Sequence, residues 1–312
     1  MVRGKHFING IDDLTGRLLL ALLANDESLR LIPETKVPYR RPPAQERKVI
    51  IISAGGSGHE PAHAGYVGHR MLDVAVAGNI LASSSAPQIL SAIQAIEAPL
   101  GALLVVKNYT GDKLNFGLAA EKAKAQGRQI QVVLVDDDVS IMGNVLVGRR
   151  GLAGVVFVHK IAGAAASSGC NMPQREEQER LAADVVEYSM DIHNEPGAET
   201  CRVMSIQDTG AKLIDILLPG GVQGSRFQGG AVAVMINNLG GLSLLELQVI
   251  ADEILQQLSD RVVAISRVFI GTPVTALDGP GVSVTLLKLD DELQTFLDAP
   301  TAVNAWPKTS AA

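Results

Sequence analysis

Apolar, β-branched segments alternate with amphipathic segments through the first half of the chain. The apolar segments are typical of buried strands, whereas apolar positions three and four residues apart are typical of helices. We predict strands at Lys48–Ala54, Leu72–Ala77, Ala102–Lys107 and Gln131–Val135, and helices at Ile11–Leu23, Ala86–Ile96, Lys113–Gln126 and Lys160–Ser168. This order predicts βαβ units, and therefore an α/β fold with a mainly parallel sheet covered by helices on both faces.

A polar and charged stretch, Cys170–Arg180, interrupts this pattern and predicts a linker that runs into a helix through Val186. A second set of elements follows: strands at Ala231–Ile236, Val262–Ile270 and Val282–Leu289, and helices at Ser205–Leu217, Ser243–Leu258 and Asp290–Leu297. We therefore predict two α/β domains, the first over residues 1–172 and a shorter second one over residues 173–312.

The composition narrows the class of protein. Hydrophobic residues make up 47% of the 312 residues and aromatic residues only 4%, so we expect a core of Ala, Val, Leu and Ile. The formal net charge is -6 and no basic stripe occurs, which argues against a nucleic-acid partner. The two cysteines lack metal-type spacing, and the apolar run Leu18–Ala24 is too short to span a bilayer. We expect a cytoplasmic protein without a membrane partner.

A glycine-rich segment, Gly55–Pro61, follows the first predicted strand. Glycines let the backbone turn sharply and approach a ligand, and Pro61 suits the first turn of a helix. The sequence therefore predicts backbone donors at a helix N-terminus beside His59. The segment lacks the lysine of a phosphate-binding P-loop, and a purely structural turn is the alternative. His59 and His63 match H-E-x-x-H, but a helix that begins at Pro61 would separate the two rings, which disfavours zinc.

A second motif, Lys-Asn-Tyr-Thr-Gly-Asp at Lys107–Asp112, also stands at the carboxyl end of a predicted strand. Asp112 is a candidate general base and Lys107 a candidate donor to a substrate oxygen. The alternative is that Thr110 or Asp112 caps the next helix. Asp136–Asp138 ends the following strand, where three carboxylates would suit magnesium or, as we favour, helix capping.

The second half offers His193, in Ile-His-Asn-Glu-Pro-Gly at Ile192–Gly197. A neutral imidazole is a capable nucleophile toward a carbonyl carbon. A histidine in a turn is nevertheless more often structural, so this motif alone leaves both interpretations open. Asn237–Gly240 ends a predicted strand and predicts a turn into the helix at Ser243.

In this order, the motifs at Gly55–Pro61, Lys107–Asp112 and Ile192–Gly197 resemble those of the dihydroxyacetone kinase K subunit. Pro61–Gly68 and Leu114–Glu121 agree with that family as well. The resemblance covers nearly all of the first predicted domain and most of the second.

The resemblance implies a covalent substrate site. In the family, a histidine at the position of His193 attacks the ketone carbon of dihydroxyacetone and forms a hemiaminal. The resemblance gives His59 a hydrogen bond to the substrate and a part in proton transfer, and it makes Asp112 the base for the attacking hydroxyl. The further pocket residues that it implies are Gly56, Ser57, Gly58 and Lys107.

The resemblance also implies which groups this chain does not carry. The family holds nucleotide and magnesium on another domain or on a separate L subunit, so we expect no metal site and no bound cofactor here. ADP or ATP with magnesium is expected on a nucleotide-binding L subunit as partner. The expected substrate is dihydroxyacetone or a similar short ketose, and the expected assembly is a homodimer.

The sequence departs from the family pattern around the third motif. The stretch between Ala166 and His193 is shorter than in typical K subunits, and Asp191 and Asn194 stand where small or glycine residues are usual. Two hypotheses follow. The first is a kinase subunit, which retention of all three motifs favours. The second is a non-catalytic paralogue that binds the ketone and acts as co-activator of a transcription regulator.

Overall fold

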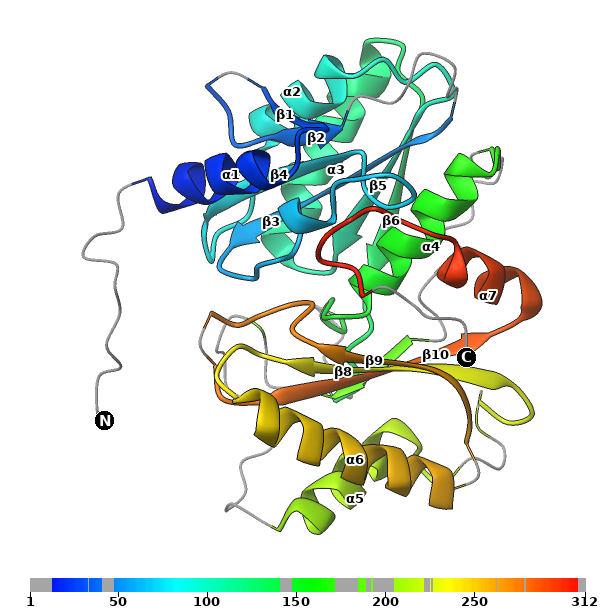
Figure 1. The fold of residues 1–312 in the computed structure, drawn as a ribbon. Coiled ribbons are helices and arrows are strands. Elements are labelled where there is room, and N and C mark those ends of the chain that lie inside the picture. The colour runs from blue at the N-terminus through cyan, green and yellow to red at the C-terminus, as the bar shows by residue number, and fades with distance from the viewer. Residues whose placement is uncertain are drawn as a thin grey trace.

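The protein is built from two sheets that lie one above the other, with helix α4 (Val155–Ser167) between them (Figure 1). The structure is a computed structural model. It describes residues 13–32, 34–40, 48–140, 148–171, 185–188, 192, 205–221, 225, 227–261, 263–277 and 279–307. This layered arrangement is the α/β fold that the alternation of segments predicts.

The first sheet has six strands in the order β1-β2-β4-β3-β5-β6. Their bounds are β1 (Leu29–Leu31), β2 (Pro38–Arg40), β3 (Ile50–Ser57), β4 (Val74–Ile80), β5 (Ala102–Lys107) and β6 (Ile130–Val135). β3 pairs in parallel with β4 and β5, and β5 pairs in parallel with β6, whereas the pairings of β2 are antiparallel. The sequence predicts the four parallel strands but misses β1 and β2, which are too short to show a period.

Both faces of this sheet are covered. α2 (Ala86–Ala95) and α3 (Thr110–Ala125) pack on one face, and α4 and the 3-10 helix η1 (Ala64–Tyr66) pack on the other. The connections from β4 to β5 and from β5 to β6 run in the same direction across the sheet. Right-handed crossovers therefore place α2 and α3 on one face, while the reverse step from β3 to β4 places η1 on the opposite one.

The second sheet has the order β7-β10-β8-β9, in which β8 and β9 are parallel and the other two pairings antiparallel. Its strands are β7 (Val185–Tyr188), β8 (Ala231–Asn238), β9 (Ala264–Gly271) and β10 (Val282–Leu289). α5 (Ile206–Leu217) and α6 (Leu244–Asp260) cover its outer face, and α7 (Asp291–Asp298) packs against α4 (Figure 1).

One apolar cluster fills the space between the two sheets. It joins Ile51 of the first sheet to Met235 and Leu287 of the second, together with the buried side of α4. Because successive strand residues face opposite sides, Ile50 and Ile52 point instead into the cluster with α2 and α3. The two halves thus share a core. The predicted division between residues 172 and 173 lies outside the described residues and stays a prediction.

Two predicted helices are wrong. Residues 185–188 form strand β7, paired antiparallel with β10, rather than the end of a helix. Their β-branched and aromatic side chains suit a strand, and β10 supplies hydrogen-bond partners along the edge of the sheet. No α-helix begins at Pro61 either. A hydrogen bond of 3.1 Å from the N–H of Ala62 to the carbonyl of His59 closes a turn there, and only η1 follows before β4.

The other helices lie close to the predicted ones, although α4 begins at Val155 rather than Lys160. Of the helices that the structure describes, none combines the length and the apolar composition needed to cross a membrane.

Candidate functional site

Two of the three sequence motifs meet at the carboxyl edge of the first sheet. The chain leaves β3 toward β4 on one side, and β5 lies on the other side, so β3 and β5 flank a topological switch point. Open α/β sheets bind ligands outside the carboxyl ends of strands at such a point. The glycine-rich segment begins within β3, which runs to Ser57 rather than ending at Ala54 as predicted, and the second motif begins at Lys107, the last residue of β5. The structure therefore brings these motifs together.

The end of β3 and the loop that follows it depend on their glycines. A Cβ on Gly56 would lie 2.7 Å from the backbone nitrogen of Ala82, so the segment after β4 packs directly on the end of β3. Gly58 has a φ of 106°, in the left-handed region that favours glycine. Its N–H donates to the carboxylate of Glu60 at 2.8 Å, and burial raises the pKa of that carboxyl. The loop is therefore held in one conformation from within.

Neighbouring elements close the outer side of the end of β3. The hydroxyl of Ser57 donates to the carbonyl of Gly78 at 2.8 Å and accepts from Thr15 on α1 (Leu14–Asn25) at 3.1 Å. Ser84 donates to the carbonyl of Gly55 at 3.3 Å. The hydroxyl hydrogen of Ser57 is thus used within the protein, and the segment around Ser84, which the sequence analysis did not single out, is part of the wall. The only feature of the sequence that marks this segment is the run of serines at Ser83–Ser85, after a predicted strand.

His59 is held by the second half of the chain. Its Nδ1 lies 2.8 Å from the carbonyl oxygen of Thr275, and the residue is 1% exposed. A carbonyl only accepts hydrogen bonds, so Nδ1 carries the hydrogen and Nε2 of the neutral ring is left as an acceptor. The N–H of Leu277 and the hydroxyl of Thr275 both donate to the carbonyl of Gly58, at 3.0 and 3.2 Å. The orientation and the tautomer of His59 are therefore fixed across the two halves.

The motif at Asn237–Gly240 anchors this contact. Asn237 donates to the carbonyl of Val274 at 2.8 Å and accepts from its N–H at 3.0 Å. Asn238 accepts from the N–H of Gly240, and Ser243 caps α6, so the predicted turn into a helix is confirmed. The reach of Asn237 to residue 274 was not predicted, because no local pattern marks a partner so far along the chain.

Lys107 and Asp112 are both buried beside the loop. Lys107 ends β5 with 1% exposure, and its ammonium lies 5.5 Å from the centre of the Tyr109 ring. Asp112 lies in the first turn of α3 with 4% exposure. The alternative that Thr110 or Asp112 caps this helix is wrong, because the N-cap is Tyr109 and no side chain caps it. A carboxylate in a first turn is stabilised by the positive end of the helix dipole.

His193 lies outside the described residues, so the structure does not place its ring. Its neighbour Ile192 is described and is 1% exposed, in the cluster between the two sheets that also holds Ala62 and Leu103. The residue before His193 in the sequence is therefore part of the core that the two halves share. Asp191 and Asn194 also lie outside the described residues.

The carboxylates at Asp136–Asp138 organise a turn. The two oxygens of Asp137 accept from the N–H groups of Leu152 and Gly154, at 2.7 and 2.9 Å, just before α4. Asp138 accepts from Ser140, and burial raises the pKa of its carboxyl. The helix capping that we favoured is wrong, because the N-cap of α4 is Gly154 without a side-chain cap, and the three carboxylates are buried in the turn. In the part of the chain that the structure describes, no group of three or more His, Cys, Asp or Glu side chains is arranged to hold a metal.

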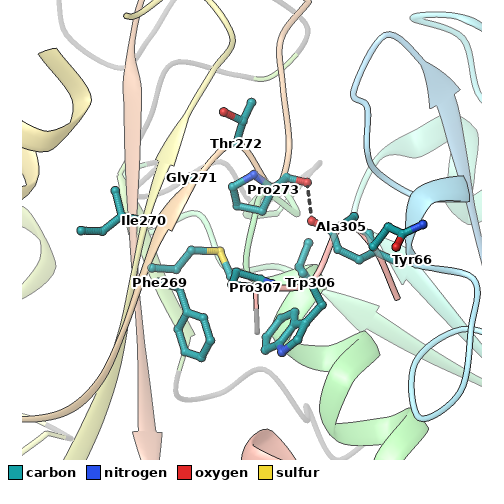
Figure 2. A pocket seen from close by; sticks show the side chains of 12 residues that line it. Tyr66, Phe269, Ile270, Gly271, Thr272, Pro273, Ala305, Trp306 and Pro307 are labelled. Carbon is teal, nitrogen blue, oxygen red and sulfur yellow. Dashed lines mark hydrogen bonds between the residues drawn. The ribbon is translucent and has the colours of Figure 1, made fainter. Parts of the chain in front are cut away.

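A small cavity lies behind the segment that holds His59. It has a volume of about 150 Å³ and is lined by Phe269, Trp306 and the chain at Gly271–Pro273, among others (Figure 2). The hydroxyl of Tyr66 donates to the carbonyl of Pro273 at 2.9 Å, the bond drawn as a dashed line in Figure 2. The predicted site residues do not line this cavity, so it is separate from the site at the carboxyl edge.

The geometry defines the class of protein: an α/β protein with a buried imidazole, ammonium and carboxylate gathered at a switch point, which suits a small polar ligand. The comparisons with known proteins then give the family. The model of the Dak1 domain matches residues 20–172 and 165–305. The chain belongs to the Dak1 domain family.

Named kinases are among the relatives. Dihydroxyacetone kinase 2 of Saccharomyces cerevisiae is 39% identical, over 92% of this chain and 56% of the relative. The native crystal structure of the dihydroxyacetone kinase of C. freundii has a TM-score of 0.86 at 34% identity, over 97% of this chain and 60% of that one. Its structure in complex with AMP-PNP and Mg2+ has a TM-score of 0.88 at 33% identity, over 99% and 62% of the two chains. This chain therefore spans about three fifths of the length of these kinases.

A non-kinase is similar as well. The dihydroxyacetone kinase operon co-activator DhaQ has a TM-score of 0.84 at 27% identity, over 96% of this chain and 99% of that one. The fold is thus common to kinases and a co-activator. The match to the family model is divided into two segments that overlap at residues 165–172, near the start of the stretch that we expect to be shortened. The yeast alignment, over 328 residues, is longer than this chain, so that relative carries insertions.

Proposed function

We propose that this chain is the ketose-binding subunit of a dihydroxyacetone kinase. The observation that carries the proposal is that His59, whose Nδ1 is held by the carbonyl of Thr275, and the buried carboxylate of Asp112 follow adjacent strands, β3 and β5, at the carboxyl edge of the sheet. An imidazole with an acceptor nitrogen and a carboxylate can each take up or pass on a proton, which the attack of a substrate hydroxyl requires.

The covalent step assigns His193 as the nucleophile. The lone pair of its unprotonated ring nitrogen adds to the ketone carbon, the C=O π bond breaks, and the oxygen takes up a proton to become a hydroxyl. The other ring nitrogen releases its proton, so the hemiaminal is neutral and atoms balance. His59 serves as the proton carrier for that oxygen through Nε2. The support from the structure is that Ile192 fixes the chain before His193 in the core shared by both halves.

In the phosphoryl-transfer step, Asp112 acts as the base for the substrate hydroxyl. The covalent bond to His193 fixes the position of the ketose, so the gain in reaction rate comes mainly from orientation. Asp112 accepts the hydroxyl proton as the oxygen attacks the phosphoryl group, and Lys107 donates to a ketose oxygen from the end of β5. Gly56, Ser57 and Gly58 supply the close backbone wall. Phosphoryl transfer also needs a nucleotide and magnesium. We assign both to a partner that corresponds to the part of the kinases that this chain does not match.

The second candidate is a ketose-binding co-activator. The likeness to DhaQ over 99% of that chain favours it. We place the kinase first because identity to the kinases, 39% and 34%, exceeds the 27% to the co-activator. If this chain is the kinase subunit, we expect it to form a homodimer.

A reconstitution assay separates the two candidates. Purified chain is mixed with a nucleotide-binding L subunit, ATP, magnesium and dihydroxyacetone, and the phosphorylated ketose is measured. The kinase proposal expects product that depends on both proteins, with a parallel assay in which a phosphoryl-donating L subunit replaces ATP as the source. A ketose adduct without product in either assay would overturn the kinase and favour the co-activator.

A further inference from the structure

Two leucines near the site have backbones in the left-handed region. Leu81, in the connection after β4, has a φ of 52°, and Leu277, between β9 and β10, has a φ of 60°. The Cβ atom disfavours this region, so a bulky residue there is uncommon. Such conformations persist only where the surrounding structure holds them, and they gather at functional sites. The contacts around these two backbones therefore point to what the leucines do.

Both leucines hold the same piece of backbone, and they hold it from opposite halves of the chain. The N–H of Leu81 donates to the carbonyl of Ser57 at 2.8 Å, and the N–H of Leu277 donates to the carbonyl of Gly58 at 3.0 Å. These carbonyls belong to the two residues before His59. Two successive peptide groups that lead to the imidazole are thus bound, one from each half.

The side chains of the two leucines also meet at Gly58. A Cβ on Gly58 would lie 3.2 Å from Cδ2 of Leu81 and 3.1 Å from Cδ2 of Leu277. Optimal contacts between carbon atoms are about 3.5 to 4.0 Å long, so both methyl groups pack directly against the side of Gly58 where a Cβ would stand. The loop is therefore held by packing as well as by hydrogen bonds.

Stability alone does not explain a leucine at position 277. The side chain of Leu277 is 46% exposed, so its burial contributes little, while its left-handed backbone is unfavourable. Asparagine adopts this conformation more readily and would keep the backbone N–H in place. What leucine adds is the methyl contact with Gly58. The residue therefore favours a fixed loop over maximal stability.

We propose that Leu81 and Leu277 are positioning residues for His59. They form a clamp, one leucine from each half, that keeps the loop ahead of His59 against the segment that carries Thr275. The carbonyl of Thr275 holds Nδ1 of His59 at 2.8 Å, so a shift of the loop relative to this segment would turn the ring. The part that this ring plays toward a ketose rests on the proposed function, whereas the clamp itself does not.

The clamp is tested at position 277 by measuring stability and adduct formation together. Leu277→Asn removes the methyl contact and relieves the backbone, so we expect a urea midpoint at least as high as that of the parent chain. Adduct formation with dihydroxyacetone should nevertheless be about tenfold slower, because a misplaced group loses part of the gain from orientation. Leu277→Met keeps an apolar contact of similar volume and should stay within about threefold of the parent rate.

Two results at position 277 would overturn the proposal. A lower urea midpoint in Leu277→Asn, or a failure of this variant to fold, would mean that Leu277 only packs. An unchanged rate of adduct formation would mean that the methyl contact does not position His59.

Nitrogen NMR of the full chain labelled at histidine tests the clamp without a ketose. Single His→Gln substitutions assign the ring signals of the six histidines. Leu277→Asn and Leu81→Asn should each shift the ring nitrogen signals of His59, and unchanged signals in either variant would overturn the proposal. If the parent chain forms no adduct, the proposed function fails, while the NMR and urea measurements still decide this inference.

Glu34→Asn is the matched control. Glu34 has a φ of 60° and stands exposed between β1 and β2, and β4 lies between these strands and β3. The substitution therefore relieves the same backbone conformation outside the clamp. It should keep or raise the urea midpoint and leave the adduct rate and the His59 signals unchanged. Shifts of the His59 signals as large as those in Leu277→Asn would contradict a clamp formed by the two leucines.

Discussion

His59 shows how one carbonyl group decides what a side chain does. Its Nδ1 is bound to the carbonyl of Thr275, so in the neutral ring Nε2 is the acceptor nitrogen. The sequence motif predicts that a histidine stands beside the loop after β3. It does not predict the tautomer, because the partner lies 216 residues away along the chain.

Asp112 gives the clearest prediction for a single residue. Asp112→Asn keeps the size and the burial of the side chain but removes the base, so we expect the ketose adduct to form while phosphorylation falls by about 10²- to 10⁴-fold. Reconstituted turnover and intact-protein mass measure the two quantities separately. Turnover within a factor of three of the parent chain would exclude Asp112 as the base.

His159 predicts an acid-sensitive fold. Burial on α4 lowers its pKa to about 3 in the folded chain, against 6.5 for the ordinary residue, so below pH 6.5 the unfolded chain binds a proton that the folded chain does not. This contribution to stability is therefore full above pH 6.5 and is lost as the pH falls toward 3. The loss is about 1.4 kcal/mol per pH unit below 6.5.

Urea unfolding at pH 7.5 and pH 5.5 measures this contribution. Between these pH values the parent chain should lose about 1 kcal/mol more stability than His159→Phe. Equal losses in the two proteins would show that His159 is not kept neutral by the fold.

At the scale of elements, the end of β8 supports the site through the segment that follows β9. Asn237 is fully buried and satisfies both backbone groups of Val274. Asn237→Ala leaves these groups unpaired, and we expect a loss of about 3 kcal/mol in the free energy of unfolding, with weaker ketose binding because His59 loses its fixed partner. Asn79→Ala, at an exposed hydrogen bond to Lys36, is the control. Unchanged stability in Asn237→Ala would contradict this account.

The elements also show what sequence patterns predict well. The parallel strands of the first sheet are long apolar runs, which is why the sequence predicts that each of the first two motifs stands at the carboxyl end of a strand. Parallel pairing of β3 with β5 then brings the two motifs to one edge. β7 was misassigned because its four residues follow a polar stretch, and its strand state depends on pairing with β10. The helix at Pro61 was expected from a local preference that the hydrogen bond between Ala62 and His59 overrides.

At the scale of the whole molecule, Lys160 joins the two halves. It is fully buried on α4, donates to the carbonyl of Phe296 on α7 at 2.7 Å, and lies 5.9 Å from the centre of the Trp306 ring. Burial lowers its pKa to about 8 from an ordinary value of 10.5. Between these values the unfolded chain binds a proton that the folded chain does not, so this residue makes stability rise with pH.

Lys160→Met removes that dependence. From pH 7 to pH 9 the parent chain should gain about 1 kcal/mol relative to this variant, measured by urea unfolding. Lys124→Met, in an exposed pair with Glu121, should follow the parent chain. A constant difference between the parent and Lys160→Met over this range would contradict the buried, partly neutral lysine.

The assembly of the site across the two halves is the part that sequence patterns reach least. His193 is predicted by its motif and by resemblance, and the preceding Ile192 lies in the shared core. Thr275 contacts His59 from the second half, and no local sequence pattern predicts this contact. The turn motif that begins at Asn237 likewise does not predict the contact of Asn237 with Val274. The account as a whole therefore depends on one ring that must meet a ketose at the edge of the first sheet.

Intact-protein mass spectrometry with dihydroxyacetone tests this claim most directly. The parent chain should gain the mass of one ketose without loss of water, because a hemiaminal retains all atoms of both reactants, and His193→Ala should show no gain. His69→Ala, in the first half, serves as the histidine control and should keep the adduct. An adduct that survives in His193→Ala, or a parent chain that never forms one, would contradict the account.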